Sequence, residues 1–150
     1  DETSRAINDL MACQITFQDR WVQLNNKQFR SLMSFALDVA ESHTGSDEQV
    51  HIDRMKRLSQ ECWPGRGIEI ERDFPDLPER KFWSRIFLDT SRAIFERSIG
   101  IHEHTFWQAR TIYLAYSTGL LFESAVQQSE PGWHAETADR QEFQRVYETQ

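Results

Sequence analysis

Apolar residues recur every three or four positions through most of this sequence, which is the spacing of one buried face of an α-helix. The plainest example lies between Lys27 and His43, where the apolar residues form one continuous stripe: Phe29, Leu32, Met33, Ala36, Leu37 and Ala40. A stripe of this kind is stable in water only when another element covers it. The sequence therefore predicts a fold built from helices that pack on one another.

The same spacing, together with capping and breaking residues, predicts six helices in all. Besides the helix at 27–43, we place them at residues 4–20, 48–61, 79–99, 105–128 and 135–149. A chain of 150 residues is also the size of one ordinary domain. We therefore expect an all-α fold: a single helical domain over residues 1–150, arranged as a bundle of about six helices.

Two stretches depart from the helical spacing. Residues 15–24, with the sequence ITFQDRWVQL, either continue the first helix or form a strand. Residues 63–78 contain three of the four prolines, and within them Ile68–Glu71 alternates as a short strand or an extended connector would. We expect one long irregular loop at 63–78. Loops of this length are uncommon in compact domains and are often functional.

The charge of the chain limits its partners. Twenty-four acidic and seventeen basic residues give a formal net charge of -7, which repels nucleic acids and anionic membrane surfaces. The most apolar stretch, Ile112–Val126, is too short and too polar to span a bilayer. We therefore expect no nucleic acid and no membrane as partner, and favour a protein with a basic surface.

The two cysteines, Cys13 and Cys62, lie far apart and match no metal-ligand spacing. A core-rich chain of this size does not need a disulfide scaffold, so we expect reduced thiols and a cytoplasmic location. The first residues show no signal-peptide pattern. The sequence begins at Asp1 rather than at a methionine, which leaves export open.

Motifs that carry catalysis or metal binding are weak or absent in the sequence. It has no G-x-S-x-G element and no phosphate-binding loop. His102 and His104 flank Glu103, but residues two apart point away from each other on a helix, so we expect no metal there. Glu48 and His51 match half of a di-iron motif that needs a second copy. We expect no cofactor.

The segment from Glu69 to Glu79 is the strongest candidate for a binding surface. It interleaves five acidic residues with apolar ones, so that charge could steer a basic protein and an apolar anchor could hold it. We predict six partner-binding residues in it: Glu69, Glu71, Asp73, Phe74, Asp76 and Glu79. The alternative is a solvated acidic loop whose apolar residues pack back onto the helices.

These features favour a non-enzymatic protein-binding module. A small, acidic, helical chain without catalytic motifs suits an immunity- or antitoxin-type inhibitor that neutralises a toxin or effector by covering its basic surface. That analogy rests on size and charge alone. Two alternatives stay open: a small helical metal-dependent enzyme that uses His102 and His104 with nearby carboxylates, and a structural helical homodimer.

Overall fold

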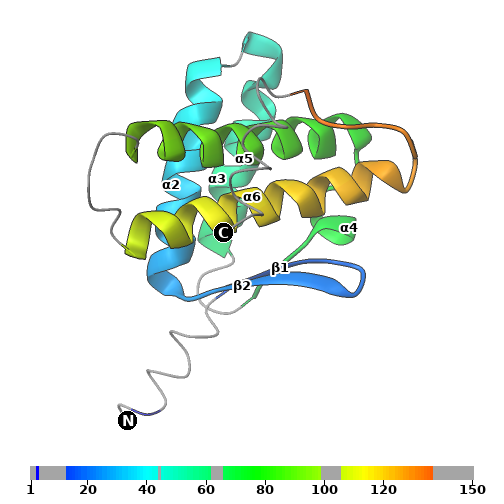
Figure 1. Ribbon diagram of the computed structural model, residues 1–150. Helices are drawn as coiled ribbons and strands as arrows, with labels where there is room; N and C mark the ends of the chain where they lie inside the picture. The colour runs from blue at the N-terminus through cyan, green and yellow to red at the C-terminus, as the bar shows by residue number, and fades with distance from the viewer. Residues whose placement is uncertain (1–2, 4–12, 44, 62–65, 99–105, 137–150) are drawn as a thin grey trace.

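The computed structural model of the protein describes residues 3, 13–43, 45–61, 66–98 and 106–136. Figure 1 shows a small sheet on one side of a group of helices. In chain order the elements are β1 (Cys13–Phe17), β2 (Arg20–Leu24), α2 (Asn26–His43), the short 3-10 helix η1 (Ser46–Glu48), α3 (Gln49–Glu61), β3 (Ile68–Glu69), α4 (Ile70–Asp73), α5 (Leu77–Ser98) and α6 (Phe106–Gln127).

The chain is mostly helical, but it is not purely all-α, because three strands form a sheet in the order β2-β1-β3. Strands β1 and β2 pair antiparallel, and β3 pairs parallel with β1. The helix predicted at 4–20 is therefore wrong from Cys13 onward, and the strand alternative for 15–24 is correct. Alternation explains the outcome: Cys13, Ile15 and Phe17 are buried while Gln14 between them is exposed.

Four of the predicted helices are confirmed with small shifts of their ends, as α2, α3, α5 and α6. The helix α2 begins with a capping box, in which Asn25 and Gln28 each accept the other's backbone N–H with their side chains, at 2.9 and 3.1 Å. The described residues contain five α-helices rather than six. The last predicted helix, at 135–149, lies outside the described residues from position 137.

The loop predicted at 63–78 is wrong for most of its described part. Ile68–Glu69 forms β3, Ile70–Asp73 forms the single turn α4, and α5 begins at Leu77. Residues 63–65 lie outside the described residues. The apolar residues of this segment explain the difference, because Ile68, Ile70 and Phe74 are each no more than 1% exposed and anchor the segment in the core.

The helix α6 is central to the arrangement. It packs along α5 and also contacts β1, β2 and α2, so it lies between the sheet and the other helices. Figure 1 shows α5 and α6 as an antiparallel pair, with the end of α5 and the start of α6 on the same side. Apolar residues from both helices meet, and the rings of Phe87 and Phe122 stack at 5.7 Å. The buried residues of α6 lie on several of its sides, as this central position requires.

The two long helices cross at Gly119 without room for a side chain. A Cβ atom added there would lie 2.7 Å from Cγ of Leu88 and 3.1 Å from its backbone nitrogen. The hydroxyl of Ser84 donates a hydrogen bond of 3.1 Å to the carbonyl oxygen of Gly119 in the same buried region. Close approach of α5 and α6 therefore depends on the absence of a side chain at this position.

Gly119→Ala is expected to destabilise the protein by about 1–3 kcal/mol, because the added methyl overpacks the crossing. That loss outweighs the gain of about 1 kcal/mol that alanine offers in a helix. The measurement is the free energy of unfolding in urea. Gly132→Ala, where an added Cβ meets nothing within 4 Å, is the control. Equal stability of both variants and the parent would show that the helices do not approach so closely.

Candidate functional site

The six residues predicted to bind a partner do not share one surface. Glu69, Glu71 and Asp76 are exposed, whereas Asp73, Phe74 and Glu79 are 7%, 1% and 2% exposed. The three buried residues are engaged inside the molecule. Only Glu69, Glu71 and Asp76 are accessible to another protein.

Glu79 belongs to an ionic cluster between α5 and α3. Its carboxylate contacts Nη1 of Arg54 and lies 3.2 Å from Nδ1 of His51. The second guanidinium nitrogen of Arg54 donates a 2.7 Å hydrogen bond to the carbonyl oxygen of Asp73. Because Glu79 is almost fully buried, these partners are what makes its burial tolerable. Its role is to join the start of α5 to α3.

Asp73 holds the connector between β3 and α5 in shape. Its carboxylate accepts hydrogen bonds from Arg66 at 2.9 Å, from Arg72 at 3.0 and 3.2 Å, and from the backbone N–H of Glu69 at 3.0 Å. Burial by itself would raise the pKa of Asp73. The hydrogen bonds from Arg72, Glu69 and Arg66 outweigh burial and hold the pKa below its usual value.

Phe74 is a core residue. Its ring meets Phe122 of α6 edge-on at 5.0 Å between centroids, and the guanidinium of Arg54 lies 5.8 Å over it. The ring is therefore unavailable as an anchor for a partner unless the connector opens. Phe74 therefore packs back onto the helices, as the alternative of a solvated acidic loop predicts, and is not exposed as a partner-binding residue would be.

The exposed acidic residues of this segment meet the end of the β-hairpin. Glu69 pairs with Thr16 in the parallel ladder, and the carboxylate of Glu71 accepts the backbone N–H of Gln18 at 3.1 Å. Asp19, also exposed, follows Gln18 in the turn. We call Asp19, Glu69 and Glu71 the acidic corner. Asp76 lies further along the chain, just before α5.

Potential metal ligands do not gather in the part of the chain that the structure describes. No three histidine, cysteine, aspartate or glutamate side chains lie close enough there to hold a metal ion. His51 pairs with Glu79 rather than with Glu48. His102 and His104, the residues of the alternative metal site, lie outside the described residues.

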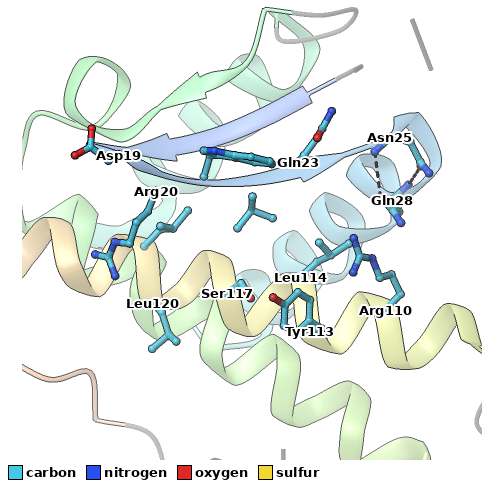
Figure 2. A pocket seen from close by; sticks show the side chains of 13 residues that line it. Asp19, Arg20, Gln23, Asn25, Gln28, Arg110, Tyr113, Leu114, Ser117 and Leu120 are labelled. Carbon is cyan, nitrogen blue, oxygen red and sulfur yellow. Dashed lines mark hydrogen bonds between the residues drawn. The ribbon is translucent and has the colours of Figure 1, made fainter. Parts of the chain in front are cut away.

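A groove of about 970 Å³ runs between β2 and α6 (Figure 2). One wall is strand β2 with its turn, from Asp19 to Gln23, and Asn25 and Gln28 close one end. The other wall and the floor come from residues of α6: Arg110, Tyr113, Leu114, Ser117, Leu120 and Leu121. The groove exists because β2 is at an edge of the three-stranded sheet, so no strand of that sheet covers this side of α6.

Helical spacing places the α6 residues on one face. Tyr113, Ser117 and Leu120 follow one another at intervals of four and three residues, so they form a row along the groove. Leu114 and Leu121 are buried beneath this row and form an apolar floor. The groove is therefore a preformed, partly apolar trough on rigid elements.

Aromatic and basic side chains border the groove. Trp21 is 55% exposed and Tyr113 is 49% exposed, although both are large and apolar. The guanidinium of Arg110 lies 5.6 Å from the centroid of the Tyr113 ring, and Figure 2 shows Arg20 extending from β2 toward Leu120. Within the described residues, neither Arg20 nor Arg110 forms an ion pair. Both charges are available to a ligand in the groove.

A second, smaller groove of about 640 Å³ lies between α2 and α3, lined by Phe29, Arg30, Met33, Ser34, Leu37, Lys56, Ser59 and Gln60. Two of its three apolar residues, Phe29 and Met33, are buried in the main core, and the third, Leu37, packs against that core. No exposed aromatic side chain borders it. This groove therefore offers fewer exposed contact groups to a partner than the β2–α6 groove does.

Sequence reasoning missed the β2–α6 groove, because its walls are almost ninety residues apart in the chain. The usable signals were the strand alternative for residues 15–24 and the long helix predicted at 105–128. Neither pattern says which strand lies at the sheet edge or which face of α6 it leaves open. That information comes from the pairing of β1 with β3.

Comparison with known proteins identifies no relative. No protein-family model, no curated protein and no solved structure matches this chain. None of the helices within the described residues is long and apolar enough to cross a membrane.

Asp73→Asn is expected to lower the free energy of unfolding at pH 7 by about 1–3 kcal/mol, because it removes the charge that the arginines stabilise. The native pKa of Asp73 is depressed. The stability that the Asp73 carboxylate contributes is therefore fully present above the ordinary aspartate pKa of about 4. It is lost as the pH falls through the lowered pKa of the folded state. Urea unfolding of both proteins between pH 7 and pH 2 should show the difference closing below about pH 4.

The exposed residue three positions later supplies the control. Asp76→Asn should change stability little at any pH, because Asp76 is exposed. A gap between Asp73→Asn and the parent that stays constant down to pH 2 would contradict the ionic role of Asp73.

Proposed function

We propose that this protein is a non-enzymatic protein-binding module whose interface is centred on the β2–α6 groove. One observation carries the proposal: in the described part of the chain three large apolar side chains are exposed, and two of them, Trp21 and Tyr113, border this one groove. Exposed apolar side chains scattered singly need no explanation. Two exposed apolar side chains that border the same open groove with an apolar floor are typical of an interaction site.

The residue types in the groove support the same conclusion. Tryptophan, tyrosine and arginine are the residues that most often carry the binding energy of protein interfaces. Here Trp21, Tyr113, Arg20 and Arg110 border one trough. The backbone that carries these side chains is preorganised, since β2 and α6 are regular elements packed on the core.

The acidic corner supports a partner that is basic as a whole. Asp19 belongs both to the corner and to the lining of the groove, so the two surfaces adjoin. The formal net charge of -7 attracts a basic protein over a distance, and the corner would orient its approach. An immunity- or antitoxin-type inhibitor of a toxin or effector is one role that this combination would suit.

The proposal is tested by cross-linking from within the groove. A photoreactive p-benzoylphenylalanine is placed at Tyr113 in one variant and, as a matched control, at Val50 in another, because Val50 is 57% exposed but outside the groove. The protein captured only from Tyr113 is identified, purified and titrated against the parent chain. Tyr113→Ala should then weaken binding at least tenfold, about 1.4 kcal/mol, while Val50→Ala changes it less than twofold.

Two results would contradict the proposal. One is a purified partner whose affinity is the same for Tyr113→Ala and for the parent. The other is capture of the same protein from Val50 and Tyr113 alike, which would show that the groove is not selective.

A further inference from the structure

We infer that the groove receives an extended segment of the partner protein, added to the sheet as a strand beside β2 and carrying two carboxylates. The inference rests on the proposed function and specifies how the groove would be filled. Three independent features lead to it: the hydrogen-bonding state of the β2 edge, the length of the groove, and the charges at its ends.

The open edge of β2 offers backbone groups to an added strand. Strands β1 and β2 are joined by the two-residue turn Gln18-Asp19, and the pair that closes such a turn, here Phe17 with Arg20, is hydrogen-bonded. Bonded pairs alternate along an antiparallel ladder, so Val22 is bonded to Ile15 while Trp21 directs its N–H and C=O away from β1. A strand laid in the groove can pair with those groups, as in β-strand addition.

The helix α6 is positioned to cover such a strand. Residues of β2 alternate between its two faces, with Val22 and Leu24 buried toward the helices and Trp21 on the opposite face. An added strand would present every second side chain to Tyr113, Ser117 and Leu120. Its remaining side chains would lie beside Trp21 on the outer face, where aromatic cross-strand pairs stabilise a sheet.

The length of the groove fixes the length of the segment. From Arg110 to Leu120 a helix rises about 15 Å, at 1.5 Å per residue. Five residues of a strand span about 14 Å, at roughly 3.4 Å per residue. The groove therefore accommodates about five residues, which is also the length of β2.

The charges at the two ends select acidic side chains. Figure 2 shows Arg20 beside Leu120 at one end of the groove, and Arg110 toward the end where Asn25 and Gln28 lie. Residues four apart in a strand share a face, so carboxylates at the first and fifth positions would reach the two arginines. An apolar residue between them would lie over Leu114 and Leu121. The expected pattern is acidic-x-apolar-x-acidic.

The same charges disfavour the other occupants. A second copy of β2 in the groove would bring another Arg20 against Arg20 and Arg110, which are of like charge. A nucleic acid would meet those arginines, but also Asp19 in the groove and the chain's net charge of -7. A short acidic segment avoids the first conflict, and its two carboxylates bring far less negative charge near Asp19 than a phosphate backbone does. A partner that is basic as a whole would offset the net charge of -7.

The test uses the full chain and a labelled peptide, acetyl-Glu-Thr-Leu-Thr-Glu-amide. NMR titration of ¹⁵N-labelled protein should show saturable shifts at Trp21 and Tyr113, with millimolar or tighter affinity. The corresponding peptide with both glutamates replaced by lysine should bind at least tenfold more weakly. The glutamate peptide N-methylated at its three central residues should bind at least tenfold more weakly too, because it cannot pair with the β2 edge.

A charge exchange supplies a positive readout that only a folded protein can give. The double variant Arg20→Glu and Arg110→Glu should lose affinity for the glutamate peptide and gain affinity for the lysine peptide. Arg85→Glu, at an exposed position of α5 outside the groove, is the matched control and should retain the preference of the parent.

The outcomes separate this inference from the function on which it rests. Absence of shifts at Trp21 with 5 mM glutamate peptide, or equal binding of the N-methylated peptide, overturns strand addition. If Tyr113→Ala still weakens the identified partner, the groove remains the interface and only the mode of binding is wrong. A dimer by light scattering whose formation protects the Trp21 amide would assign the groove to a second copy and also overturn the inference.

Discussion

The pairing of Ile68 and Glu69 with Ile15 and Thr16 decides which side of the sheet is open. Strand β1 has two edges, and β2 occupies one of them through the hairpin. Since β3 takes the other, β1 becomes the central strand, and among the described residues no strand pairs with the outer edge of β2. The groove beside α6 is a direct consequence. Two residues of parallel ladder thus determine the surface that we propose for binding.

Because β3 pairs with β1 over only two residues, this pairing depends on the connector between β3 and α5. Asp73 accepts the backbone N–H of Glu69, and Glu71 accepts that of Gln18, so carboxylates on both sides of the ladder fix its geometry. Phe74 then anchors the connector against Phe122. The acidic residues of this segment therefore divide by role. Asp73 and Glu79 stabilise the fold, while Glu69 and Asp76 face solvent.

The helices could be predicted from the sequence, and the sheet could not be predicted with the same certainty. Four helices follow from apolar spacing together with capping and breaking residues, because these signals are local in the sequence. The hairpin turn lacks the usual Asn-Gly signal: Gln18 adopts a positive φ of 55°, and its N–H is bonded to Glu71, 53 residues later. Similarly, counting charges in 69–79 could not show that Arg54 and His51 of another helix hold Glu79. Long-range contacts of this kind are absent from local patterns.

The central claim is that the β2 edge is open in the free protein, and amide hydrogen exchange at two neighbouring residues tests it most directly. The amide of Val22 is bonded to Ile15, whereas that of Trp21 points away from the sheet. In NMR-detected exchange of the isolated chain, Trp21 should exchange close to the rate of an unstructured peptide. Val22 should be protected at least a hundredfold. Equal protection of both amides would show that another strand already covers this edge, and would contradict the account.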